Sequence, residues 1–383
     1  MNILIVVPWY GQSVIGGVVS SVRYTSEEFA RRGHAISSLV DGDSAAVGQI
    51  GEENGRPIFA CYLRSPRSVP FRLKAPIGFL AHLPRTMRAL RTFLAHSRTD
   101  VSVIFYPGSH HIYFYLLKKF FGRRYVLSVV GSDIKRDAKE NWTSRWVMTR
   151  LVQNADLFIA NSEEILQATR EITGRIQVPV AVIYPSINPE WGEGSPERSS
   201  ELPERYILTL PDRDADLVVE AFGRLAEKYP DVHLVMVGTA PLEPAVSRQI
   251  ESLGLTDRVV RPGDIAPEAM PAVYKGALFG VIPSRLDTYG MVFLEFQLMA
   301  RALVASRAGA LPETITDGFN GYLVPPDNAA EMALKMGALL DNPELCRKMG
   351  QNGRRLTLEK FSLAKRGEEY ERLLAEIVQK QLP

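Results

Sequence analysis

The chain has 383 residues, of which 46% are hydrophobic and 23% charged, and its formal net charge is +2. This length favours two domains of roughly 180 residues each, and the composition is that of a soluble globular protein, which excludes a disordered chain. No apolar run reaches the roughly 18 residues that a membrane-spanning helix needs.

The first predicted element is a buried strand at residues 3–7. It stops at Pro8 and has no basic flank, so we interpret it as a strand and not as a signal peptide. Strand-like runs then alternate with helical patterns almost to the end, which predicts parallel sheets covered by helices on both faces. The sequence predicts strands over residues 3–7, 35–40, 101–106, 125–130, 157–160, 180–183, 206–210, 233–237, 259–262, 278–282, 303–305 and 321–324.

The segment between Asn54 and Thr99 contains nine basic residues and no acidic one. Apolar residues within it fall at helical spacing, which predicts a helix whose stripe would lie either on an anionic membrane surface or against the core. Residues 1–190 hold 23 Lys+Arg and 15 Asp+Glu, a net +8, whereas residues 191–383 hold 22 and 28, a net −6. No nucleic-acid-binding module is recognisable, so we do not expect nucleic acid as a partner. The apolar stripe of the helix predicted between Asn54 and Thr99 consists of Leu80, Leu83, Met87, Leu90 and Leu94, with Arg85, Arg88 and Arg91 between them.

Residues 185–203 are rich in Pro, Gly, Ser and Glu, which is typical of a linker. We therefore expect an N-terminal domain over 1–188, a hinge over 189–203, a C-terminal domain over 204–360 and a final helix over 361–383 that returns to the first domain. Both domains are expected to be doubly wound, with a ligand between the carboxyl ends of their strands.

Residues 283–295 are the most informative stretch. An apolar strand meets a Pro-Ser turn and then a helix that is apolar nearly all round, so the carboxylate of Glu295 needs a polar partner. The helix start offers free NH groups to an anion such as phosphate. Asp287 lies about 12 Å from Glu295 along a helix axis, so the two acids would address different parts of a nucleotide diphosphate sugar. Alternatively, Asp287 is only the helix N-cap and Glu295 is structural.

Short motifs in a fixed order carry a resemblance to a known family. They are Gly16-Gly17, Arg32-Gly33-His34, Gly131-Ser132-Asp133-Ile134, residues 154–163, 283–295, 308–313 and 317–325. With these motifs the chain resembles the retaining glycosyltransferases of family 4 over nearly its full length. The resemblance implies the GT-B fold, an α/β architecture of two doubly wound, parallel-sheet, Rossmann-like domains that face each other across a cleft.

The resemblance also implies roles for individual residues. Glu295 would hold the ribose hydroxyls, Asp287 would approach the donor sugar, and backbone NH groups would cradle sugar and phosphates. The implied catalytic residues are Asp287, Asp133 and Arg213. The implied donor-binding residues are Gly16, Gly17, Arg213, Pro262, Gly263, Ser284, Arg285, Asp287, Tyr289, Gly290, Met291, Val292 and Glu295. The acceptor side would include His110, His111 and Ser132.

This chain departs from the family pattern at the diphosphate grip. The loop after the strand at 206–210 has no Lys, which leaves Arg213 and Arg285 as candidate cations, and Asp287 replaces the usual Glu. Alternating acids at Asp212, Asp214 and Asp216 could hold a divalent cation instead, although they are also explained as the first turn of a helix. We expect no metal and no cofactor beyond the nucleotide-sugar substrate.

The expected function is a metal-independent, retaining glycosyltransferase that moves a sugar from a nucleotide diphosphate donor to an envelope glycan or lipid-linked acceptor, as in polysaccharide biosynthesis. Two alternatives are a catalytically impaired partner or glycan-binding subunit, and a nucleotide-sugar epimerase or hydrolase of the same fold. Two lone cysteines suit a reducing cytoplasm. We therefore expect a cytoplasmic protein, with peripheral attachment to the inner face of the cell membrane as a possibility.

Overall fold

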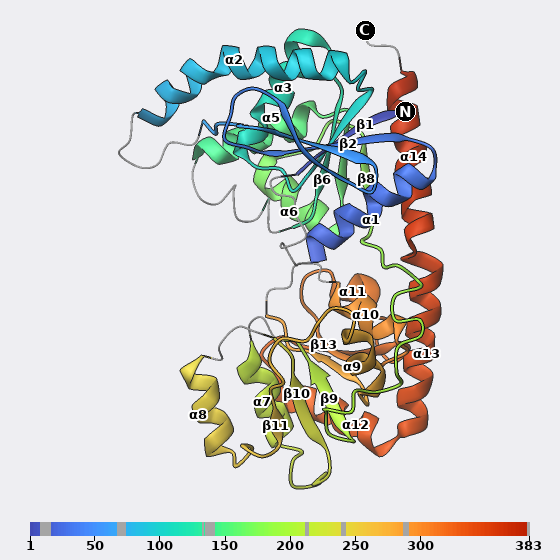
Figure 1. Ribbon diagram of the computed structural model, residues 1–383. Helices are drawn as coiled ribbons and strands as arrows, with labels where there is room; N and C mark the ends of the chain where they lie inside the picture. Colours follow the sequence, from blue (N-terminus) through green and yellow to red (C-terminus); the bar gives the residue numbers. More distant parts are fainter. Residues whose placement is uncertain are drawn as a thin grey trace. The chain divides into compact units, whose positions relative to one another are not determined.

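The computed structural model describes residues 1–7, 17–66, 74–131, 134, 142–210, 214–238, 243–285 and 291–380. The chain forms two compact units, each with its own sheet (Figure 1). The first unit comprises Met1–Pro185 and Leu363–Pro383, and the second comprises Ser186–Ser362. Both ends of the chain therefore belong to the first unit. Within the described residues, no helix is both long enough and apolar enough to cross a membrane.

The first unit contains an eight-stranded sheet in the order β3-β4-β2-β1-β5-β6-β7-β8. All neighbouring strands are parallel except β3 and β4, which pair antiparallel at one edge. The strands are β1 (Asn2–Val6), β2 (Ala35–Asp41), β3 (Gly48–Glu53), β4 (Arg56–Cys61), β5 (Val101–Phe105), β6 (Tyr125–Val129), β7 (Leu157–Ala160) and β8 (Val180–Val182).

Alternating apolar side chains of this sheet supply two separate cores, because successive residues of a strand point to opposite faces. Leu4 and Val6 belong to the core beneath α2 (Lys74–His96), α3 (Ile112–Phe121), α5 (Trp142–Asn154) and α6 (Glu163–Thr173). Ile3 and Ile5 belong to the opposite core, beneath α1 (Gly17–Arg31) and α14 (Leu363–Gln379). The last helix thus completes one face of the N-terminal sheet.

The predicted helix between Asn54 and Thr99 is α2, and the structure decides where its stripe points. Leu90 and Leu94 are fully buried in the core of the first unit, and Leu83 and Met87 pack against that core. Leu80 is exposed, as are the three arginines Arg85, Arg88 and Arg91. Most of the stripe is therefore a core face.

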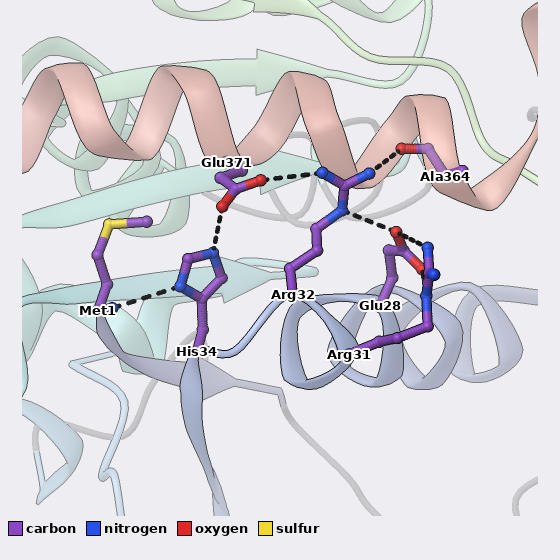
Figure 2. A network of polar contacts seen from close by, with 7 residues as sticks. All are labelled: Met1, Glu28, Arg31, Arg32, His34, Ala364 and Glu371. Atoms are coloured by element: carbon purple, nitrogen blue, oxygen red, sulfur yellow. Dashed lines mark hydrogen bonds and ion pairs between the residues drawn. The ribbon is translucent and has the colours of Figure 1, made fainter.

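Polar contacts fix α14 to the end of α1 (Figure 2). Arg32, which directly follows α1, donates to Glu28 of α1 at 2.7 Å, to Glu371 at 2.9 Å and to the carbonyl oxygen of Ala364 at 2.7 Å. His34 Nε2 lies 3.1 Å from the second oxygen of Glu371. The Arg32 guanidinium therefore joins both helices through three acceptors.

The second unit contains a six-stranded, fully parallel sheet in the order β11-β10-β9-β12-β13-β14. Its strands are β9 (Tyr206–Thr209), β10 (His233–Met236), β11 (Val259–Val260), β12 (Gly280–Ile282), β13 (Leu303–Ser306) and β14 (Gly321–Val324). One core lies between the sheet and α7, α8 and α12. The helices are α7 (Ala215–Gly223), α8 (Pro244–Ser252), α9 (Met270–Gly276), α10 (Val292–Leu298), α11 (Leu311–Thr314), α12 (Ala329–Asp341) and α13 (Pro343–Lys360).

Every strand predicted from the sequence is present, with ends that differ by at most two residues. The exception to a purely parallel plan is the β3–β4 hairpin, which the sequence interpretation did not include. Asn54 and Gly55 form its two-residue turn with positive φ angles of 49° and 75°, the conformation that a tight hairpin turn requires.

Candidate functional site

The carboxyl ends of β9 and β12 in the second unit position the candidate donor residues. Ser284 and Arg285 follow β12, Met291 is the N-cap residue of α10, and Val292 is its first residue. Pro262 and Gly263 follow β11, which is separated from β12 by β10 and β9, and these three strand spacings correspond to roughly 14 Å. The structure therefore places these predicted residues along one edge of the sheet, with Pro262 and Gly263 at its far end.

Helix α10 holds Glu295 close to β12. Gly280 of β12 allows this approach, because a Cβ atom there would lie 2.5 Å from the Phe296 ring. Phe293, Leu294, Phe296 and Leu298 are buried, and Glu295 is partly buried between them. The predicted apolar helix around this acid is confirmed.

The polar partner that Glu295 needs is Tyr274, on α9. The Tyr274 hydroxyl donates a hydrogen bond to Glu295 Oε2, and no other side-chain hydrogen bond to this carboxylate occurs within the described part of the chain. Burial raises the pKa of Glu295, and the hydrogen bond from Tyr274 opposes that shift. Burial also raises the pKa of Tyr274, with the Glu295 charge as the second cause. Within the described residues, the other carboxylate oxygen of Glu295 therefore accepts no side-chain hydrogen bond.

Arg285 is paired with three carboxylates. Its guanidinium donates to Asp214 at 2.8 Å, to Asp216 at 2.9 and 2.7 Å, and also to Asp327. Its backbone NH donates to Asp214 at 2.9 Å, and Asp214 itself has a positive φ of 59°. The hydrogen bond from Arg285 lowers the pKa of Asp216. The cation expected at the diphosphate thus has protein partners, with which a phosphate would have to compete.

Of the alternating acids, Asp214 is the N-cap residue of α7 and Asp216 lies in its first turn. Both accept hydrogen bonds from Arg285, and within the described residues no group of three or more His, Cys, Asp or Glu side chains could hold a metal ion. The interpretation as a helix start therefore applies to these two residues, and Asp212 lies outside the described part of the chain.

On the acceptor side, His110 and His111 form part of η1 (Ser109–His111), directly before α3. Burial lowers the pKa of both imidazoles, to about 4 for His110. His111 accepts a hydrogen bond from the Gly108 NH at 2.9 Å, and Gly17 is the first residue of α1. The remaining predicted site residues lie outside the described residues: Gly16, Ser132, Asp133, Arg213, Asp287, Tyr289 and Gly290.

Three polar residues at these sites were not predicted from the sequence. Tyr274, on α9, contacts Glu295, and Asp327, in the segment after β14, contacts Arg285. Asp41, at the end of β2, lies 3.8 Å from His110. Each contact joins segments at least 21 residues apart, so sequence periodicity carries no signal for it.

Comparisons with known proteins agree with this architecture. Residues 209–356 match the family model described as glycosyl transferases group 1, and residues 16–186 match the glycosyl transferase 4-like domain. One relative is the alpha-D-kanosaminyltransferase of Streptomyces kanamyceticus, 32% identical over 47% of this chain and 50% of the relative. Another is the GDP-mannose-dependent alpha-(1-6)-phosphatidylinositol monomannoside mannosyltransferase of Mycolicibacterium smegmatis, 25% identical over 66% of this chain and 70% of the relative. The match thus spans half the length of the first relative.

Two solved structures share the fold over almost the whole chain. Anabaena HepE in complex with UDP aligns with a TM-score of 0.74 at 17% identity, covering 98% of this chain and 100% of that one. Sucrose-phosphate synthase from Thermosynechococcus elongatus aligns with a TM-score of 0.74 at 19% identity, covering 98% and 99%.

Proposed function

Since the chain belongs to the family 4 glycosyltransferases and has their GT-B fold of two parallel-sheet α/β domains, we propose that it transfers a sugar from a nucleoside diphosphate donor to a hydroxyl group of a glycan or lipid-linked acceptor. The anomeric configuration of the sugar is retained, and no metal ion takes part.

The observation that carries this proposal is the Glu295 carboxylate. It lies on a helix of apolar residues, within the segment that matches the family model, and has a single hydrogen-bond donor in the described part of the protein. Burial of a charged group with incomplete hydrogen bonding is costly. The ribose hydroxyls of a nucleotide would supply the missing donors.

The proposed contacts are common to donors with different bases and sugars. The related mannosyltransferase is named as GDP-mannose-dependent, and HepE was solved with UDP, with UDP and glucose, and with UDP-glucose. Either base would present the same ribose and diphosphate to Glu295 and to the start of α10. The donor is therefore proposed only as a nucleoside diphosphate sugar.

In the proposed reaction, the acceptor hydroxyl attacks the anomeric carbon on the face from which the diphosphate departs, the bond from that carbon to the phosphate oxygen breaks, and the hydroxyl proton passes to the departing diphosphate. Negative charge grows on the leaving phosphate, and the backbone NH groups from Tyr289 to Val292 together with the cations Arg213 and Arg285 would stabilise it. Asp287 and Asp133 would face the donor sugar, and Gly16 and Gly17 would admit the diphosphate without a side chain in the way. His110, His111 and Ser132 would lie on the acceptor side.

The test is to incubate the protein with a panel of UDP-, GDP- and ADP-sugars and to measure turnover as release of the nucleoside diphosphate. We expect release from at least one donor, undiminished by EDTA, and an anomeric proton signal in the product that shows retention. No release from any donor would support the catalytically impaired alternative. The pairing of Arg285 with three carboxylates favours that alternative, because the same carboxylates compete with a phosphate for this cation. Isomerised or hydrolysed sugar that is never transferred would support the epimerase or hydrolase alternative.

We also propose a peripheral, cytoplasmic location on an anionic membrane surface. The exposed face of α2 carries Arg85, Arg88 and Arg91 next to the exposed apolar side chains of Ile77 and Leu80, a combination that favours anionic headgroups. Flotation with phosphatidylserine vesicles should recover the protein at low salt and release it at high salt, because exposed charges are screened. Absence of salt-sensitive binding would contradict this location.

A further inference from the structure

Asp41 and His110 lie on opposite sides of the carboxyl end of β1. The strand β1 runs between β2 and β5, all three are parallel, and the sheet order reverses at this point. Asp41 is the last residue of β2, and His110 lies in η1, which follows β5. Ligands of parallel α/β sheets bind in the crevice at such a reversal, outside the carboxyl ends of the strands.

The two side chains approach each other without forming a hydrogen bond. His110 Nε2 lies 3.8 Å from Asp41 Oδ2, beyond hydrogen-bond distance. His110 Nε2 is buried and has no hydrogen-bond partner among the described residues, whereas 44% of the Asp41 side chain is exposed. Each atom thus retains an unused hydrogen bond. A single oxygen atom about 2.8 Å from both would complete both hydrogen bonds.

The ring of His110 is held in place by its neighbours. It packs against His111 with ring centroids 3.9 Å apart and a tilt of 45° between the rings, and His111 accepts the hydrogen bond from the Gly108 NH. Ser109 is tied to Ser65, in the segment after β4, by an oxygen–oxygen contact of 2.6 Å. The imidazole is therefore pre-oriented toward Asp41.

The backbone of Asp41 is held equally well. Asp41 pairs in register with Cys61 of β4, and the NH of Gly42 still donates to the Cys61 carbonyl at 3.1 Å. A Cβ atom at position 42 would lie 2.8 Å from Ala60 Cβ, so the two chains remain in close contact after the strand ends. The main chain of Asp41 is therefore fixed against β4, and its carboxylate can approach His110 only by rotation of the side chain.

At neutral pH the pair consists of a carboxylate and a neutral imidazole. Burial lowers the pKa of His110 to about 4 and raises that of Asp41 to about 6, and the exposed part of Asp41 moderates the cost of its charge. The contact is therefore not an ion pair under these conditions. A carboxylate beside a neutral imidazole repels anions and suits a neutral hydroxyl group.

We propose that Asp41 and His110 bind one hydroxyl group of a polyhydroxylated acceptor, which donates to Asp41 Oδ2 and accepts from the Nε2–H of His110. This inference rests on the proposed transferase function and adds Asp41 to the acceptor side as a specificity-determining residue. It identifies the acceptor class at this position as a neutral sugar or polyol.

The first experiment reads the imidazole directly. The protein, labelled with ¹⁵N-histidine, is titrated with glycerol, myo-inositol and methyl α-D-mannopyranoside, and the His110 signal is identified by its loss in His110→Phe, which keeps a ring against His111. We expect at least one polyol to shift that signal in the wild type and in Asp43→Asn, a matched exposed control on the same loop, and not in Asp41→Asn. An unmoved His110 signal with all three polyols would overturn the inference.

The second experiment separates this inference from the transferase proposal. The ratio of transfer to donor hydrolysis is measured with the same three polyols as acceptors. Loss of the charged acceptor should lower that ratio about tenfold or more in Asp41→Asn, and loss of the neutral imidazole donor should lower it about two- to tenfold in His110→Phe, with partial recovery in His110→Gln. If both variants keep the ratio of the wild type, the proposed contact of a hydroxyl group with Asp41 and His110 is refuted, while the transferase proposal stands. No hydrolysis of any donor by the wild type would refute the transferase proposal, while the histidine titration still tests the pair.

Discussion

The Glu295 carboxylate destabilises the folded C-terminal unit at neutral pH, because burial raises its pKa above the usual value. A raised pKa means that the fold prefers the protonated acid. That preference stabilises the fold at a pH below the pKa that Glu295 has in the unfolded chain. The stabilisation is lost as the pH rises through the higher pKa that Glu295 has in the folded protein. Glu295 therefore lowers the stability of the fold at neutral pH, as we expect of a residue that serves the proposed nucleotide binding.

Glu295→Gln is therefore expected to raise the melting temperature at pH 7 by about 2–4 °C, or on the order of 1 kcal/mol. Glutamine keeps the shape and can still accept from Tyr274. Calorimetric scans at pH 4 and pH 7 check the sign, since the gain should shrink at the lower pH. Glu251→Gln, on the exposed side of α8, is the matched control, and a lower melting temperature for Glu295→Gln would contradict the account.

Arg285 can bind a diphosphate only in competition with Asp214, Asp216 and Asp327. Asp216→Asn removes the partner that accepts two of its hydrogen bonds and also removes a negative charge beside the proposed phosphates. We expect the affinity for the preferred nucleoside diphosphate to rise about two- to fivefold. Isothermal titration calorimetry measures it, with Asp231→Asn as the control from a separate exposed pair with Arg205. A weaker affinity would mean that the pairing of Arg285 with Asp216 serves to hold the segment after β12 in place.

At the scale of elements, the contact between α1 and α14 depends on a glycine. A Cβ atom on Gly367 would lie 2.3 Å from Glu28 Cγ and 2.9 Å from Arg32 Nε, within the network that joins the two helices. Gly367→Ala should therefore cost about 1–3 kcal/mol of unfolding free energy in denaturant titrations. Gly337→Ala on α12, where the nearest atom lies 3.5 Å away, should be neutral or stabilise by up to about 1 kcal/mol. Equal effects of the two substitutions would contradict the packing at α14.

The elements that sequence reasoning predicted are those with a strong apolar signal. Buried parallel strands such as β5 and β6 are apolar except for one serine each, and their positions are confirmed almost to the residue. The sequence of β3, Gly-Gln-Ile-Gly-Glu-Glu, is almost wholly exposed, and β4 contains a proline, so neither has that pattern. The Asn54-Gly55 turn was the available signal for this hairpin.

The site was predictable only where one segment carries it. The apolar helix around Glu295 required a polar partner, and the structure supplies Tyr274. That partner could not be named from the sequence, because the contact depends on how α9 packs against α10. The same holds for Asp41 and Asp327, which reach their partners from other strand ends of the sheets. The roles assigned to Asp287, Asp133 and Arg213 stay predictions.

At the scale of the whole molecule, the first unit is built from both ends of the chain. Helix α14 contributes Tyr370, Leu374 and Ile377 to its core, and the Tyr370 hydroxyl contacts Ser128 Oγ at 2.8 Å. A chain ending at Ser362 should lose hydrogen-exchange protection in β5 and β6, because the exposed apolar surface costs several kcal/mol. Protection in β9 and β12 should persist, since their unit is complete. Unchanged protection in β6 would show that α14 is dispensable to the first unit.

The central claim is that a nucleoside diphosphate completes the hydrogen bonding of Glu295. Its most direct test is calorimetric titration of the wild type and Glu295→Gln with UDP, GDP and ADP, using Glu251→Gln as the control. The account predicts that at least one nucleotide binds the wild type and the control alike, and binds Glu295→Gln about tenfold or more weakly. Equal affinity for Glu295→Gln, or no binding of any nucleotide to the wild type, would contradict it.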